Sequence, residues 1–186
     1  ELEHFAAEAI EKVERGQARL VPWDEIKDNP TPEVKISPVA AIPHKSKAFR
    51  TILDLSYRIR LKNGGVINSV NDTTEKVAPQ GSIDQIGESL TRIIYAFAEA
   101  DEDAKIFMAK WDIKDGFWRM GGEKGQEYNF AYVLPQPPGY PIMLVIPTSL
   151  QMGWVESPPL FCAASETARD IVEEYIETEV ASLPTH

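Results

Sequence analysis

The sequence predicts a mixed α/β fold of the α+β type, in which helices combine with antiparallel strands. Apolar residues recur at helical spacing in three stretches, residues 2–15, 83–97 and 157–175. Short apolar or alternating runs, typical of strands, lie between these stretches, and two of the runs flank a short basic turn. That arrangement is typical of a hairpin of two antiparallel strands.

Length and composition limit the classes of protein to consider. The chain has 186 residues, 43% of them hydrophobic, which is enough to bury one sizeable core. No apolar run approaches the ~20 residues of a membrane span, and the acidic N-terminus does not resemble a signal peptide. We therefore expect a soluble intracellular protein, cytoplasmic or nuclear, with no membrane contact. The net charge of -10 means that any contact with nucleic acid must be local.

The N-terminal half should contain a helix followed by a hairpin. The helix covers residues 2–15 and ends at Gly16. Prolines then punctuate residues 21–43, which predicts extended chain and loop, with "KISPVAAI" as the likeliest strand in it. "FRTILDLS" should pair with that strand, which leaves "PHKSKA" as the hairpin tip, and residues 62–81 should form a long loop.

The C-terminal half should alternate between helix and strand. Ser82 and Gln85 form a capping-box pattern, which predicts that one amphipathic helix begins there and runs to about Phe97. "KIFMAKWDI", "EYNFAYVL" and "YPIMLVIP" have strand character. A second helix should start at Ser157 and contain the only cysteine, Cys162, which we expect to be a buried core residue.

Two aspartates stand in an apolar and aromatic setting in "AKWDIKDGFWRM", residues 109–120. Asp112 ends a predicted strand, and Asp115 follows in the turn. Aspartate favours turns because its side chain bonds to nearby backbone amides, so both could be structural caps. Carboxylates are costly to bury unless something pairs with them, so the setting of these two aspartates needs an explanation.

Three stretches in one order give this chain a resemblance to the fingers and palm of a reverse transcriptase. They are "SPVAAIPHKSKAFRTILDLS", "MAKWDIKDGFWRM" and "PTSLQMGWVESPPLFCAASE". The resemblance covers roughly residues 33–180 and implies a right-hand polymerase fold with this arrangement: an N-terminal helix and linker (1–32), a fingers-like region (33–110), a partial palm (111–180) and a frayed tail (181–186). The implied partners are an RNA or DNA template-primer and deoxynucleotides.

The first two stretches, by this resemblance, contain the nucleotide and metal residues. Lys45, Lys47 and Arg50 would face the triphosphate, although a solvated hairpin tip would also explain the lysines. Asp112 would be the catalytic metal ligand, with the main-chain carbonyl of Ile113 adding an oxygen to Mg²⁺ or Mn²⁺. Residues 115–117 would also contact the nucleotide: Asp115, which could instead cap the turn, Gly116, and Phe117, which would lie under the sugar unless it is a core residue.

The third stretch resembles the family's motif at the start of the palm helix. Met152 and Gly153 would contact the nucleotide, while Trp154, Ser157 and Pro158 would position the template. Gln151 and Met152 depart from the family's residues directly before the glycine, so the contacts made there should differ.

The family's Tyr/Phe-x-Asp-Asp motif does not occur in the 186 residues. We therefore expect a fragment or truncated reading frame that is inactive alone in templated nucleotidyl transfer. Two alternatives stay open at this point. The chain could be a non-catalytic reverse-transcriptase-like domain that binds nucleic acid or protein, or an unrelated phosphotransferase that uses "DIKD".

Overall fold

The computed structural model describes residues 1–28, 34–45, 48–110 and 112–180, and it divides into two units. The first unit combines Glu1–Lys76 with Asp115–Ser157, and the second combines Val77–Lys114 with the segment that starts at Pro158. Helices and antiparallel sheets occur together, which confirms the predicted α+β class. None of the described helices has the length and apolar character needed to cross a membrane.

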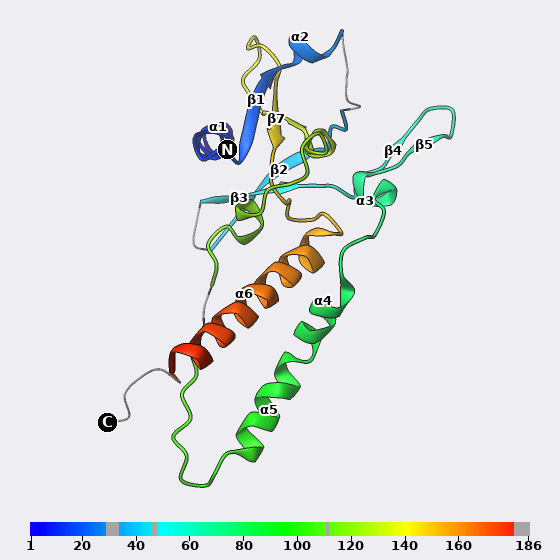
Figure 1. The fold of residues 1–186 in the computed structure, drawn as a ribbon. Coiled ribbons are helices and arrows are strands. Elements are labelled where there is room, and N and C mark those ends of the chain that lie inside the picture. The colour runs from blue at the N-terminus through cyan, green and yellow to red at the C-terminus, as the bar shows by residue number, and fades with distance from the viewer. Residues whose placement is uncertain (29–33, 46–47, 111, 181–186) are drawn as a thin grey trace. The chain divides into compact units, whose positions relative to one another are not determined.

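A three-stranded antiparallel sheet forms the centre of the first unit. Its order is β1 (Ala18–Pro22), β7 (Met143–Pro147) and β6 (Tyr132–Val133). The middle strand β7 contains three consecutive fully buried residues, Leu144, Val145 and Ile146. Its apolar run therefore contributes to the core on both faces of the sheet. The helix α1 (Leu2–Glu14), which Figure 1 shows beside β1, adds Phe5 and Ala9 to that core.

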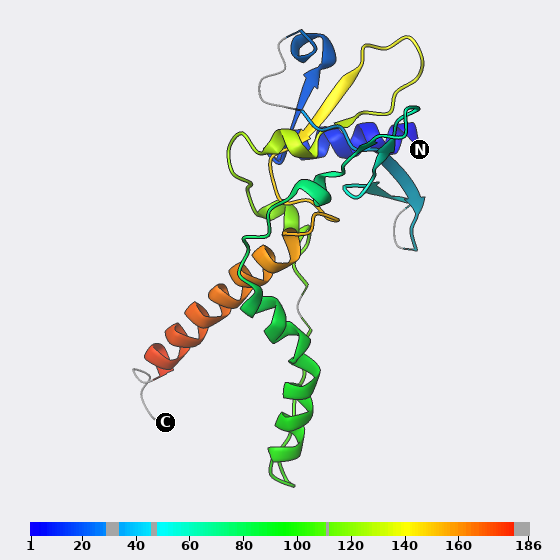
Figure 2. The ribbon, with the colours of Figure 1, turned by 90° about the vertical axis from the view of Figure 1, so that its right-hand side faces the viewer.

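The predicted hairpin is confirmed in the same unit. Strand β2 (Val39–Pro43) pairs with β3 (Phe49–Leu53) in antiparallel register, with Ile42 opposite Arg50. In Figure 2 these two strands lie side by side as arrows in the blue-to-cyan part of the chain. At the tip of this hairpin Lys45 is among the described residues, while Lys47 lies outside them.

Several boundaries in the first unit differ from the sequence prediction. The sequence predicts extended chain and loop over residues 21–43, with the likeliest strand at 35–42. In the structure β1 also extends into this region, where it pairs with β7, and the short helix α2 (Trp23–Ile26) follows it. The predicted loop 62–81 is also more ordered. It contains β5 (Val66–Ile67), which pairs with β4 (Ile59–Arg60), and the helix α3 (Val70–Thr73).

The strand predicted over 127–134 is confirmed only at β6. Residues Glu127–Phe130 form a 3-10 helix, η2, and a second 3-10 helix, η1, covers Gly116–Arg119. In this segment only the two residues of β6, Tyr132 and Val133, pair with β7. A strand needs a partner for its backbone groups, so the unpaired residues adopt a helical turn instead.

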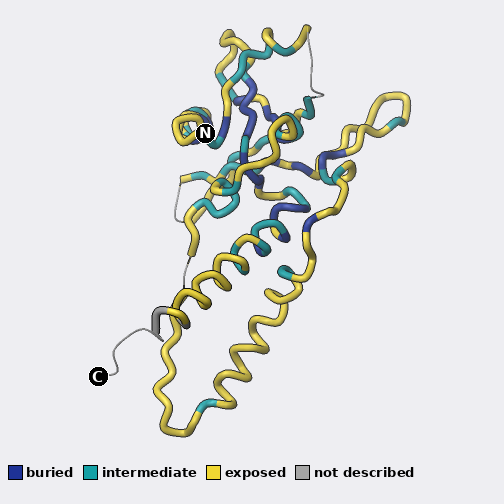
Figure 3. Tube along the Cα trace, in the orientation of Figure 1, coloured by how far each residue is buried: buried dark blue, intermediate teal, exposed yellow. Residues whose placement is uncertain are grey.

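In the second unit, the predicted helix from Ser82 to Phe97 is divided into two. Helix α4 (Gln80–Gly87) begins after Pro79, so the Ser82 and Gln85 capping box was wrong. Helix α5 (Ser89–Glu99) follows directly. Gly87 lies at the break, which fits the low helix propensity of glycine. The apolar stripe of α5 is exposed to solvent, as Figure 3 shows, and includes Leu90 and Ile94.

The strand predicted over residues 105–113 is absent from the described part of this segment, which is irregular. Phe107 is 89% exposed and Met108 73% exposed. A lone extended segment leaves its backbone groups without a ladder, so its apolar pattern alone does not make it a strand. Helix α6 (Ser157–Val180), by contrast, starts at the predicted residue, and Cys162 is buried within it as expected.

Candidate functional site

The hairpin places its candidate residues on the surface of the first unit. Lys45 and Arg50 are both exposed, Lys45 at the tip and Arg50 in β3 opposite Ile42. The Arg50 guanidinium contacts the Met152 sulfur, although the two residues are 102 positions apart in sequence. The fold therefore brings the basic hairpin beside the stretch that contains Gly153.

The Gly153 stretch has a backbone that only glycine adopts readily. Gly153 has φ +94°, and a Cβ built there would lie 3.4 Å from the Leu53 carbonyl oxygen at the end of β3. Met152, next to it, is 49% exposed. The segment thus lies directly against the hairpin, with the Met152 side chain directed outward to Arg50.

Trp154 and Ser157 fix the remainder of this stretch. The Trp154 ring packs edge-on against Phe130 at 5.2 Å, and its indole Nε1 donates to Thr74 Oγ1 at 2.9 Å. Ser157 is fully buried, and its hydroxyl donates to the Gln151 carbonyl at 2.7 Å. Pro158, the next residue, is exposed and belongs to the second unit. In the structure, Trp154 and Ser157 act as internal anchors of the turn that precedes α6.

Sequence reasoning missed Asn71, which ties this turn to α3. Its Nδ2 donates to the Gly153 carbonyl at 2.8 Å, and its Oδ1 accepts from the Val155 amide at 2.9 Å. Helix α3 is held by a capping box of Ser69 and Asp72. Asparagine is common in loops, so "NSVNDTT" gives no signal that one of its residues bridges to position 153.

Asp72 is itself held by a cation. The side chain of Arg58 donates to both carboxylate oxygens, and Ser69 adds its backbone amide and hydroxyl. These hydrogen bonds, led by those from Arg58, hold the pKa of Asp72 well below its ordinary range. Asp72 is therefore charged across the physiological range and keeps α3, with Asn71, in place.

The two aspartates of "DIKD" are in different structural settings. Asp112 and Ile113 are exposed and belong to the second unit. Asp115, Gly116 and Phe117 are partly buried and belong to the first. The positions that the resemblance assigns to the metal thus belong to the second unit, and those that it assigns to the nucleotide belong to the first.

Two cations hold Asp115: Lys12 of α1, and Arg15, which directly follows this helix. Its carboxylate lies 3.4 Å from Lys12 Nζ and 3.3 Å from an Arg15 guanidinium nitrogen. Lys12 is 5% exposed, and its ammonium also lies 4.5 Å from the centre of the Trp118 ring. Asp115 has φ 55°, a left-handed conformation uncommon outside glycine, and within the described chain its side chain makes no capping bond to η1. The structure therefore shows Asp115 in ion pairs with Lys12 and Arg15.

A two-metal site is not assembled by the residues that the structure describes. Among them, no three His, Cys, Asp or Glu side chains gather in a group that could hold a metal ion. The exposed Asp112 carboxylate has the oxygen chemistry that Mg²⁺ prefers, and such ions are often held by one or two carboxylates together with substrate phosphates. Asp112 thus fits as one ligand of Mg²⁺ or Mn²⁺ but not as a complete site.

Within the first unit, the geometry defines a surface at which a basic hairpin meets a glycine turn held by a partly buried tryptophan and a buried serine. Comparison with known proteins adds no family to this description. No protein-family model matches the chain, and no curated protein matches it significantly.

Proposed function

We propose that this chain supplies the nucleotide-binding part, fingers and first portion of palm, of an RNA-directed DNA polymerase that acts on a template-primer. The observation that carries the proposal is the contact between Arg50 and Met152 beside Gly153. Two stretches that resemble separate polymerase motifs, about a hundred residues apart, meet in one unit, as a shared nucleotide site requires.

The side chains of this surface suit a triphosphate. Arg50 offers several donors in a planar fork, and contact with the weakly accepting Met152 sulfur leaves others available. Lys45 is exposed at the tip of the same hairpin and adds a mobile charge. Anionic oxygens between these two side chains would therefore receive charge-assisted hydrogen bonds.

Phe117 and the Gly153 turn would set the remaining contacts. A rigid ring beside the sugar excludes an extra hydroxyl by steric clash. The turn at Gly153 allows close backbone approach to a ligand, since glycine has no Cβ. Asp112, with the carbonyl of Ile113, would supply oxygen ligands to Mg²⁺ or Mn²⁺. When bound, such ions activate the attacking hydroxyl and stabilise the leaving oxygen.

The proposal is tested by binding of a deoxynucleoside triphosphate with Mg²⁺ to the 186-residue chain, measured by calorimetry. Arg50→Ala should weaken binding by about tenfold or more, because a charge-assisted contact is lost. Arg60→Ala is the matched control, since Arg60 is an exposed strand arginine outside the β2 and β3 hairpin. Equal affinities for the Arg50 and Arg60 variants would contradict the proposed nucleotide site.

A non-catalytic domain of the same kind is the second candidate. The net charge of -10, which opposes strong binding of free triphosphates, favours it. Such a domain would bind a template-primer duplex or a protein but show no Mg²⁺-dependent affinity for deoxynucleotides. Titration with both ligands in parallel distinguishes the two candidates.

A further inference from the structure

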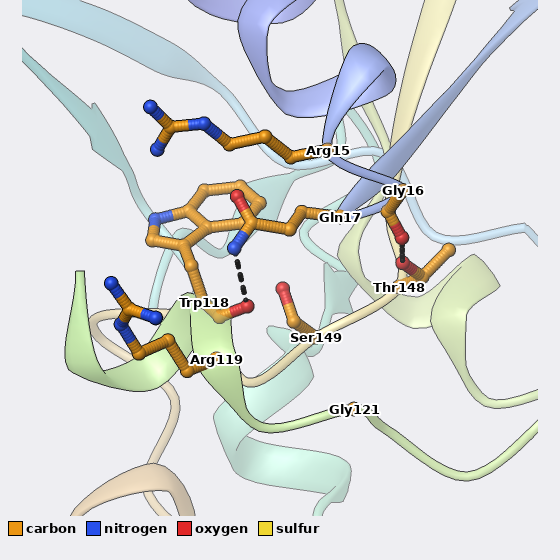
Figure 4. Close-up of a pocket in the computed structure, with 8 residues that line it drawn as sticks. All are labelled: Arg15, Gly16, Gln17, Trp118, Arg119, Gly121, Thr148 and Ser149. Atoms are coloured by element: carbon orange, nitrogen blue, oxygen red, sulfur yellow. Dashed lines mark hydrogen bonds between the residues drawn. The ribbon is translucent and has the colours of Figure 1, made fainter.

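A pocket in the first unit is lined by residues other than those of the hairpin. Three chain segments surround it: the end of α1 with Arg15 and Gln17, the 3-10 helix η1 with Trp118 and Arg119, and the segment after β7 with Ser149. Its volume is about 340 Å³, within the range of small-ligand sites. Figure 4 shows these side chains around the pocket.

Two polar atoms at this pocket have no hydrogen-bond partner within the part of the chain that the structure describes. They are the Ser149 hydroxyl oxygen and Gln17 Oε1, and Ser149 is only 3% exposed. Buried polar atoms are nearly always paired, because leaving one unpaired is unfavourable. Gln17 Nε2 already donates to the Trp118 carbonyl at 2.9 Å, which fixes the orientation of the amide. The wall therefore presents an acceptor, Gln17 Oε1, and a hydroxyl that can donate.

The same pocket has two guanidinium groups. Arg15 is fixed by Glu11 at 2.7 Å and by Asp115 at 3.3 Å, so its planar fork is already oriented. A guanidinium has five donors, and these ion pairs do not use all of them. In Figure 4 the Arg15 and Arg119 side chains extend to the same side of the pocket with the Trp118 ring between them in this view, and the Ser149 hydroxyl points toward Gln17 and Trp118. This combination suits a phosphate group, which guanidinium binds in a bidentate manner.

The unpaired atoms and the charges together define the ligand. A bare phosphate would accept from the arginines and from Ser149, but its own hydroxyl would then have to reach Gln17 Oε1 as well, whereas a larger ligand can place a second group there. A ligand with a phosphate and a separate donor group satisfies all three. We propose that this pocket binds a phosphate monoester of mononucleotide size, with its phosphate at Arg15, Arg119 and Ser149 and a donor group at Gln17. The Trp118 ring supplies an apolar wall beside it.

This pocket does not depend on the proposed polymerase role. Its lining contains neither Arg50 nor Asp112, and arginine binds phosphate without a metal ion. The two sites can therefore be tested separately on the same protein by working in EDTA, where a Mg²⁺-dependent triphosphate site is silent.

Adenosine 5'-monophosphate in EDTA is the probe, with adenosine and inorganic phosphate as its two halves. We expect saturable binding of the monophosphate by calorimetry, tighter than that of either half. Ser149→Ala and Arg119→Ala should each weaken it about tenfold or more. Arg60→Ala should leave it unchanged, because Arg60 is an exposed arginine outside both sites. Ser149→Ala should also keep or raise the thermal midpoint, because it removes an unpaired buried hydroxyl, so lost affinity cannot be attributed to unfolding.

Three results would overturn the proposal. The first is no saturable binding of the monophosphate to the wild-type chain. The second is unchanged affinity in a folded Ser149→Ala variant, which would mean that water alone pairs that hydroxyl. The third is inorganic phosphate binding as tightly as the nucleotide, which would reduce the pocket to a simple anion site. Gln17→Met adds a check, because it keeps the side-chain size but removes the acceptor, and it should weaken the nucleotide more than phosphate.

Discussion

At the scale of single residues, Gly153 connects backbone geometry with the proposed site. Its φ of +94° is unfavourable for residues with a Cβ, and its neighbours on each side contact Arg50 and Phe130. Gly139 has the same φ of +94°, but a Cβ at that position would meet nothing within 4 Å. Comparison of these two glycines therefore separates the free-energy cost of a left-handed backbone from the effect of a position beside the hairpin.

Gly153→Ala and Gly139→Ala should both lower the free energy of unfolding by about 1–2 kcal/mol, because both force a Cβ into a left-handed conformation. Only Gly153→Ala should also weaken deoxynucleotide binding. Urea denaturation beside calorimetry measures both quantities. Equal nucleotide affinity in the two variants would mean that the Gly153 turn does not take part in binding.

Phe117 tests the sugar contact at the same scale. Its ring is partly buried, so it can act either on the ligand or in packing. If it lies under the sugar, Phe117→Val should reduce the preference for deoxynucleoside over ribonucleoside triphosphate while the chain stays folded. Phe107→Val is the control, since Phe107 is 89% exposed. A folded Phe117 variant with unchanged preference assigns the ring to packing alone.

At the scale of elements, α1 and η1 are joined through one buried lysine. Lys12 contacts both Asp115 and the Trp118 ring, so it holds the turn that follows "DIKD". Because Arg15 also pairs with Asp115, loss of the lysine would take away one of the two cations that hold this carboxylate.

Lys12→Ala should lower the free energy of unfolding by about 1–3 kcal/mol, since a buried charge-assisted contact and its packing are lost. Lys27→Ala should change it by less than about 1 kcal/mol, because Lys27 forms an exposed pair with Asp24 three residues away. Thermal or urea denaturation of both variants checks the difference. Similar losses would show that the Lys12 contacts add nothing beyond those of a surface pair.

The helix α3 gives a prediction about pH. The pKa of Asp72 is lowered in the folded state, chiefly by hydrogen bonds from Arg58, so its contribution to stability is complete above the ordinary carboxyl range. That contribution should be lost as the pH falls from about 4 toward the lower folded pKa. Asp72→Asn should remove this part of the acid dependence. Denaturation midpoints at pH 7 and pH 3 for the variant and the wild type measure it, and an unchanged difference would contradict the role of Asp72.

At the scale of the whole molecule, the two units carry different parts of the proposed function. The hairpin, Phe117 and the Gly153 turn belong to the first, and Asp112 belongs to the second. Two-metal chemistry needs several oxygen ligands, and the 186 residues contain no Tyr/Phe-x-Asp-Asp motif to supply them.

The 186-residue chain should therefore bind deoxynucleotide but not extend a primer with Mg²⁺. A gel assay with a labelled primer on an RNA template measures extension, and an Asp112→Asn variant controls for a contaminating polymerase. Templated extension by the wild-type chain that the variant abolishes would show that these residues complete a site in some other way.

The sequence alone determined the α+β class, the helix at residues 2–15, the β2 and β3 hairpin and the start of α6 at Ser157. Each depends on a local pattern, because a short turn, an apolar stripe or a helix start is set by neighbours in the chain. The sequence also indicated Arg50 and Gly153 as candidate nucleotide-binding residues, through its resemblance to a reverse transcriptase. Tertiary structure alone decided that these two stretches meet, that Asn71 fastens the turn, and that Ser149 and Gln17 lie in one pocket. It also left the described residues of 105–113 without a strand and divided the helix predicted over 82–97 into α4 and α5. Contacts between residues a hundred positions apart leave no periodic trace in sequence, and a strand exists only where a partner takes up its backbone hydrogen bonds.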